Sequence, residues 1–195
     1  MSQLNVDQIK NRAGTGPALE MLSGGNVAID TDTFYIDTNN DRIGINTASP
    51  EVSLHVAGGD GCYFEAHPMI EKIDVISSSS NGSTTLYVSN GSIHRYTSNN
   101  NGNWTPNFYW GNGVNIDNNM NTGDSIVQTI ISPNQSNSGY CTSINIDGSN
   151  RSVEWQDGEQ PDERGGDSGY DVYQFTIIKT SGNSYIIFGN QTYCN

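Results

Sequence analysis

The stretch Phe34–Val56 constrains the fold most strongly, because short apolar segments alternate in it with residues that interrupt regular structure. Phe34–Ile36 and Arg42–Ile45 are each typical of a short strand, and residues 37–41 between them all tolerate turns and left-handed backbone. This order predicts a β-hairpin. Pro50 interrupts the chain again, since it has no N–H to donate to a ladder, and Ser53–Val56 is expected to form a further short strand.

Residues 1–60 contain too few large apolar side chains to build a core of their own. Isolated hairpins are marginal in water, and a sub-domain of this size needs a further source of stability. No disulfide or metal pattern supplies one, so we expect this region to associate with identical copies or to dock on other proteins. The side chains expected to make the oligomer contacts are Phe34, Tyr35, Ile36, Ile43, Ile45, Leu54 and Val56.

From Ser83 onward, short strand-like segments recur at intervals of roughly 8–12 residues, which is the rhythm of a β-sandwich. The alternation in Asp171–Lys179 places Tyr173, Phe175 and Ile177 on one side of a strand. The number of segments suits a jelly-roll-like sandwich. The expected strands are Thr84–Val88, Ser92–Ser98, Asn107–Gly111, Ser125–Ser132, Cys141–Ile146, Ser152–Gln156, Val172–Lys179 and Ser184–Gly189.

The composition supports an all-β chain of several parts. Hydrophobic residues make up 33% of the sequence, below the usual level of about 45–50%, and turn-forming Asn, Ser and Gly are abundant. We expect an extended N-terminal arm over residues 1–30 and an intertwined β shoulder over 31–76. A Ser- and Asn-rich linker over 77–83 would then lead into a sandwich domain over 84–195.

The charge balance excludes several classes of partner. The net charge is −13, and only 8 Lys and Arg residues are spread along the chain. We therefore expect no binding to nucleic acid or to an anionic membrane surface. Met1–Lys10 lacks the apolar segment of a signal peptide, and no apolar run approaches the ~18 residues of a membrane span.

The N-terminal segment carries Leu4, Val6 and Ile9 in a polar background, and Gly14–Pro17 ends it. Two interpretations remain open for this segment, an attachment arm and a disordered tail. In the first, Leu4, Val6 and Ile9 anchor the protein, and the arm becomes ordered only when it is attached.

Three patterns in the chain resemble structural proteins of bacteriophages. The order of a Phe/Tyr strand, an Asn/Asp turn, Arg42–Ile45, a Thr-x-Ser-Pro turn and Leu54–Val56 resembles the shoulder of tail-fibre and other appendage proteins. The opening, with Leu-x-Val-Asp, Ile9 and Gly14–Pro17, resembles the N-terminus of marine phage and cyanophage structural proteins. The region from Thr84 to Asn190 is similar to a common phage domain through Arg151–Trp155, Gln160-Pro161 and Asp171–Phe175.

The resemblance implies a non-enzymatic virion protein of the tail-fibre or appendage type, a homotrimer that is assembled in the host cytoplasm and contacts other virion proteins. A capsid decoration or head-fibre protein of the same build is an alternative. A module that binds host glycans is another.

The sequence contains no catalytic or cofactor motif that we could identify. His55, His67 and His94 are far apart, and no spacing marks a triad or a metal site, so we expect no catalytic residue, no cofactor and no metal. Asp162 and Glu163 lie in a polar loop rather than in a paired-carboxylate pattern.

Two smaller patterns are best explained by ordinary structural roles. Asp37–Asp41 has the start of a calcium loop but lacks its Gly and Glu, which favours a plain turn. The cysteines at 62, 141 and 194 match no disulfide framework, so we expect them not to be joined within one chain.

The aromatic cluster around Trp104–Trp110 has two interpretations. Trp104, Tyr109 and Trp110 lie in an Asn-rich setting, in which aromatic rings could stack on sugar rings while amides donate hydrogen bonds. Alternation along a strand could instead bury Phe108 and Trp110.

Overall fold

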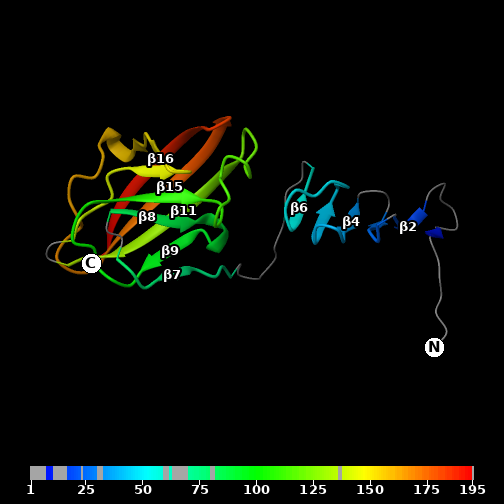
Figure 1. The fold of residues 1–195 in the computed structure, drawn as a ribbon, viewed down its shortest axis with the longest axis horizontal. Helices are drawn as coiled ribbons and strands as arrows, with labels where there is room; N and C mark the ends of the chain where they lie inside the picture. The colour runs from blue at the N-terminus through cyan, green and yellow to red at the C-terminus, as the bar shows by residue number, and fades with distance from the viewer. Residues whose placement is uncertain are drawn as a thin grey trace. The chain divides into compact units, whose positions relative to one another are not determined.

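A computed structural model of the chain describes residues 8–10, 17–22, 24–29, 33–58, 62, 70–79, 82–135 and 138–194. Its regular structure consists of strands and two single 3-10 turns, Val88–Asn90 and Gln156–Gly158 (Figure 1). The prediction of an all-β fold is therefore confirmed.

The chain divides into two compact units, Met1–Pro68 and Met69–Asn195. The division lies ahead of the linker expected over residues 77–83. The reason is strand β7 (Asp74–Ile76), which we assigned to the shoulder but which pairs with β9 (Ile93–Tyr96) of the second unit. The described strands within residues 1–30, where we expect an arm, pair into the same sheet as residues 34–56.

The first unit is one six-stranded sheet whose spatial order follows the chain. Neighbouring strands are antiparallel up to the last pair, in which β5 and β6 are parallel. The strands are β1 (Gln8–Lys10), β2 (Pro17–Met21), β3 (Val27–Ile29), β4 (Phe34–Asp37), β5 (Arg42–Ile45) and β6 (Leu54–Val56).

The predicted hairpin is formed by β4 and β5, which pair Phe34 with Ile45 and Asp37 with Arg42. The Asp37 carboxylate accepts backbone N–H bonds from Asn39 and Asn40 at 3.0 and 3.3 Å, and a bond from the Asn40 amide at 2.8 Å. These hydrogen bonds, with the Asn40 side chain as the largest cause, lower the pKa of Asp37. The segment between the two strands is thus a hydrogen-bonded turn.

The second unit contains two sheets. The four-stranded sheet has the order β13-β12-β10-β8, and the six-stranded sheet has the order β14-β16-β15-β11-β9-β7 (Figure 1). The strands not yet defined are β8 (Gly82–Tyr87), β10 (Trp104–Tyr109), β11 (Ser125–Pro133), β12 (Ile144–Ile146), β13 (Ser149–Arg151), β14 (Glu154–Trp155), β15 (Tyr170–Ser181) and β16 (Ser184–Cys194).

From β7 to β12 the chain passes alternately between the two sheets. Strands β7, β9 and β11 are parallel neighbours in one sheet, and β8, β10 and β12 are parallel neighbours in the other. Strands β15 and β16 then close the larger sheet as an antiparallel hairpin beside β11. A jelly roll is built from antiparallel pairs, so this winding with parallel pairs does not bear out that detail of the prediction.

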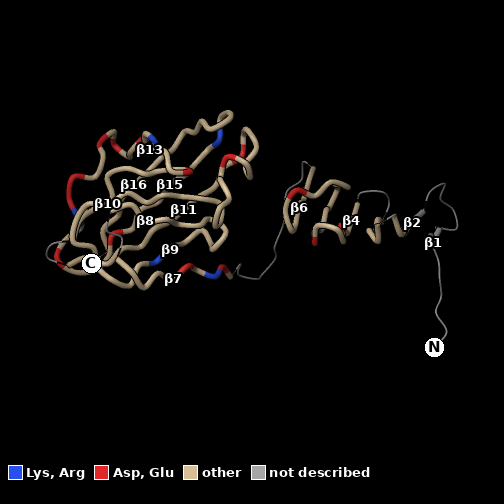
Figure 2. The backbone as a smooth tube through the Cα atoms, viewed as in Figure 1, with Lys and Arg blue, Asp and Glu red and all other residues tan. Residues whose placement is uncertain are grey.

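A single apolar core joins the two sheets of the second unit. Trp104 on β10 packs edge-on against Tyr173 on β15, with ring centroids 5.4 Å apart, and Phe108 meets Phe175 at 6.1 Å. Tyr173, Phe175 and Ile177 are all fully buried, as the alternation along this strand predicted. Most Asp and Glu residues of this unit lie in its loops (Figure 2).

Candidate functional site

The pairing register of the first sheet places its apolar side chains on one face. Opposed residues share a face, so one row runs through Val27, Ile36, Ile43 and Leu54, and a second runs through Ile29, Phe34, Ile45 and Val56. Met21 on β2 opposes Val27, and Leu19 lies two positions earlier on the same strand. We call this set the apolar face: Leu19, Met21, Val27, Ile29, Phe34, Ile36, Ile43, Ile45, Leu54 and Val56.

None of the side chains on the apolar face is buried within the described part of the first unit. Leu54 is 56% exposed, Met21 49% and Ile43 37%. A contiguous exposed apolar surface is uncommon on a soluble monomer and marks a site of interaction.

The opposite face of the same sheet is covered by the chain's own turns. Ala28 and Tyr35 are buried there, and the Tyr35 hydroxyl accepts a 2.8 Å hydrogen bond from the Asn26 amide. Gly44 permits the turn after β5 to lie against the sheet, since a Cβ at this position would be 2.2 Å from the carbonyl oxygen of Thr47. The described turns of the first unit therefore cover the face with Ala28 and Tyr35 and leave the apolar face uncovered.

The structure sorts the residues that we expected at oligomer contacts. Phe34, Ile36, Ile43, Ile45, Leu54 and Val56 share the apolar face, whereas Tyr35 points to the covered side and is 9% exposed. Tyr35 is therefore a packing residue of the first unit. Of the expected anchoring residues, Ile9 lies in β1 opposite Leu19, and Leu4 and Val6 lie outside the described residues.

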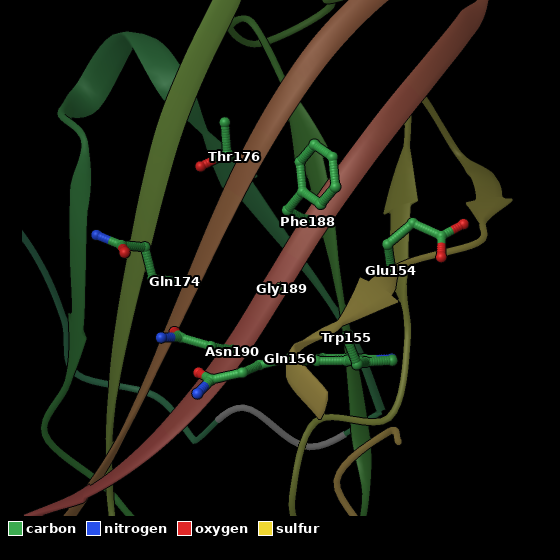
Figure 3. A pocket seen from close by; sticks show the side chains of 8 residues that line it. All are labelled: Glu154, Trp155, Gln156, Gln174, Thr176, Phe188, Gly189 and Asn190. Carbon is green, nitrogen blue, oxygen red and sulfur yellow. The ribbon is translucent and has the colours of Figure 1, made fainter. Parts of the chain in front are cut away.

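A groove lies on the second unit where β14 meets β16 and β15 (Figure 3). Its volume is about 360 Å³, within the range of small-ligand sites. Register places Thr176, Phe188 and Glu154 in one row and Gln174 and Asn190 in the next. The remaining lining residues are Trp155, Gln156 and Gly189.

The groove combines one accessible ring with several planar amides. The Phe188 side chain is 51% exposed, although it sits in the middle of a long strand. Trp155 packs edge-on against Phe175 of the core at 5.8 Å, and it lies over Gly189. A Cβ at Gly189 would come within 3.0 Å of the indole and 2.6 Å of Val153, so the glycine allows the indole to pack against β16 on the core side of the sheet, opposite to Phe188.

A second hollow of about 300 Å³ shares Trp155, Gln156 and Asn190 with the groove. Its other wall is the loop after the second 3-10 turn, with Asp157, Glu159, Gln160, Pro161 and Asp162, and its floor includes Gln191 and Tyr193. Because they share these residues, the two hollows adjoin each other beside β16, and we call the pair the trough. Among the residues that line either hollow, none is Lys or Arg, and the carboxylates belong to Glu154, Asp157, Glu159 and Asp162.

A buried carboxylate holds the loop that forms this wall. Asp171 is 1% exposed, and it accepts hydrogen bonds from the Asn134 amide at 2.8 Å and from the Gly165 N–H at 2.9 Å. Burial raises the pKa of Asp171, and these hydrogen bonds oppose the rise. The Gln191 amide also donates to the Glu163 carbonyl at 3.2 Å, so two contacts tie the loop to the sheet.

The aromatic residues that we expected at a glycan contact lie elsewhere. Trp104 is 2% exposed in the core, so no sugar can stack on it, which corrects that part of the prediction. Tyr109 and Trp110 are half-buried at the end of β10 and beyond it, and neither lines the groove. The sequence alternation in Asp171–Lys179 already separates two groove residues, Gln174 and Thr176, from the core residues of the same strand. The other groove residues come from β14 and β16, which are distant in the sequence.

Tertiary contacts bring one histidine next to a carboxylate. His94 is fully buried, with Nδ1 3.1 Å from Asp74 and Nε2 2.9 Å from the Gln128 side-chain oxygen. This chain of polar groups links β7, β9 and β11 through the interior. A side chain with no exposed surface cannot reach a substrate, so its role is to satisfy buried polar groups.

The described residues also include three thiols. Cys141 is buried, and Cys62 and Cys194 are exposed free thiols. Within the described ranges, His, Cys, Asp and Glu side chains nowhere gather in a group of three that could hold a metal ion. No described helix is long and apolar enough to cross a membrane.

Comparison with known proteins adds no relative, because no family model, curated protein or solved structure matches the chain.

Proposed function

We propose that this chain is a non-enzymatic structural subunit that associates with copies of itself through the apolar face of its first unit and displays its second unit. We further propose that the assembly is a bacteriophage tail fibre or related virion appendage, in which the N-terminal segment with Leu4, Val6 and Ile9 attaches to other virion proteins. The apolar face is the observation that carries the first part. The sequence patterns shared with phage appendage proteins support the second.

A second copy of the chain is the occupant that suits this face best. A lone sheet with one open apolar side lacks the packed second layer that a stable domain needs. Every copy carries the same face, so one type of contact between copies supplies that layer and is repeated by symmetry. The face carries no ionisable side chain, so copies that carry a net charge of −13 each can meet there without bringing acidic groups into the contact.

A trimer is the assembly that we propose, because phage fibres of the type that the sequence resembles are trimeric. The physical argument from the apolar face supports self-association of any closed symmetry. Sedimentation equilibrium on the purified chain separates these numbers directly, and a mass three times that of the monomer is the expected result. A monomer at high concentration would exclude self-association and would favour docking of the face on a different protein.

The virion assignment has its own test. Mass spectrometry of purified phage particles that encode this chain should detect its peptides at a stoichiometry typical of an appendage. Gold-labelled antibodies against the second unit should then mark the tail rather than the capsid. Labelling over the whole capsid would support a decoration protein in its place, and absence from particles would refute a virion role.

A further inference from the structure

We propose that the trough formed by β14, β15, β16 and the following loop binds a neutral oligosaccharide. The proposal concerns the second unit alone. It does not depend on self-association through the first unit or on the virion assignment.

The electrostatics of the trough select the charge of the ligand. Both hollows lack Lys and Arg among their lining residues, while Glu154, Asp157, Glu159 and Asp162 contribute carboxylates. Phosphate, sulfate and uronate groups need cationic or clustered N–H partners, and they would be repelled here. The lining therefore disfavours anionic ligands.

The polar groups select a ligand rich in hydroxyls. Gln174 and Asn190 oppose each other across β15 and β16, and Gln156 reaches the same hollow from the 3-10 turn (Figure 3). A carboxamide offers two donors and an acceptor in one plane, and a hydroxyl is both donor and acceptor. Neighbouring hydroxyls on a sugar ring can therefore be bound by one amide, which a purely apolar ligand could not use.

The aromatic groups select a ligand that also has an apolar side. Phe188 projects into the solvent from the middle of β16 with half of its surface exposed, beside the amides rather than away from them. A pyranose ring presents C–H groups on its face and hydroxyls at its edge, which matches a ring flanked by amides. Phe188 is therefore the ring on which a sugar would stack, and Trp155, which lines both hollows, packs its own ring against Phe175 of the core.

The length of the trough selects an oligomer over a single sugar. The two hollows, of about 360 and 300 Å³, adjoin each other, since Trp155, Gln156 and Asn190 line both. Both are open to solvent along the sheet surface, which suits a chain that passes over several subsites.

The first experiment incubates the full-length chain with an immobilised panel of neutral and anionic oligosaccharides. The neutral set contains glucans, mannans, galactans and N-acetylglucosamine oligomers, and the anionic set contains sialylated, sulfated and uronate chains. We expect binding within the neutral set only. No binding on the panel, or a preference for the anionic set, overturns the proposal.

The second experiment measures the dissociation constant of the best neutral oligosaccharide by isothermal titration calorimetry. Phe188→Ala should weaken binding about tenfold, because it removes the stacking ring. Gln174→Ala should weaken it by a similar factor, and this exposed polar change leaves the core intact. The matched control is Ile186→Ala, on the same strand and 45% exposed but outside the groove, which should change the constant less than twofold.

An equal loss in Ile186→Ala and Phe188→Ala would place binding elsewhere and overturn the proposal. Unchanged binding in both Phe188→Ala and Gln174→Ala would do the same. Thermal unfolding of each variant, followed by tryptophan fluorescence, confirms that any loss comes from the site.

Discussion

Replacing Ile43 and Leu54 together by Asn should dissociate the assembly while the second unit stays folded. The two side chains oppose each other on β5 and β6 in the first row of the apolar face, and they are 37% and 56% exposed in the single chain. Together their exposed surface amounts to nearly one whole aliphatic side chain. Covering that much surface stabilises a contact by about 1.5–3 kcal/mol per chain.

The loss of association free energy increases with the number of copies in the assembly. In a trimer, three such losses amount to about 4.5–9 kcal/mol for the whole assembly, which corresponds to a roughly thousand- to million-fold smaller association constant. The cost of covering the introduced amides adds to this loss, since they would have no partners on an apolar face. Sedimentation equilibrium should therefore give the monomer mass for Ile43→Asn/Leu54→Asn at concentrations where the wild-type chain is assembled.

The control is Val52→Asn/Val114→Asn, which replaces two side chains that are 48% and 40% exposed and lie outside the apolar face. It should keep the wild-type mass. All three tryptophans lie in the second unit, so their fluorescence reports on its folding separately from the first unit. An assembled Ile43→Asn/Leu54→Asn variant, or equal dissociation of the control, would refute the role of the face.

Three further results are expected for the second unit. Phe175→Ala should lower the free energy of unfolding by about 3–5 kcal/mol, measured by denaturant titration, because it empties a fully buried site between the two sheets. A thiol reagent should label Cys62 and Cys194 in the native protein but Cys141 only after unfolding, since burial both shields the Cys141 thiol and raises its pKa. Rapid labelling of all three thiols in the native protein would contradict the burial of Cys141. Burial raises the folded-state pKa of Asp171, so the contribution of this group to stability is greatest below its unfolded-state pKa and is lost as pH rises through its folded-state pKa. Asp171→Asn should therefore remove this part of the pH dependence. Identical profiles of unfolding free energy against pH for the variant and the wild type would speak against this.

Local sequence determined the elements and several of their faces. The Asp37 carboxylate accepts hydrogen bonds from the backbone N–H groups of Asn39 and Asn40 in the turn that follows it, so the β4–β5 hairpin could be predicted from neighbouring residues alone. The period of two in Asp171–Lys179 identified Tyr173, Phe175 and Ile177 as core residues for the same reason. The small number of large apolar side chains near the hairpin could also be counted in the sequence, and this number limits the apolar surface that the region can bury by itself.

Only the tertiary structure determined which distant segments pair or pack with each other. Strand β7 belongs to the second unit because it pairs with β9, although its sequence resembles that of the other short strands. Trp104 is buried because a second sheet covers β10, whereas the aromatic content of its neighbourhood was equally compatible with exposure. Register, rather than residue type, separated Tyr35 from its apolar neighbours.

The trough illustrates the same limit. Phe188, Gln174 and Trp155 come from three strands, and β14 lies beside β16 only through a parallel pairing that no local pattern specifies. Period-two alternation tells which residues share a side of one strand, but it does not tell which strands become neighbours or whether a further layer covers them. The energies that decide those questions arise from contacts between residues far apart in the chain, so only the folded structure shows that the apolar face is open and that the two hollows of the trough adjoin.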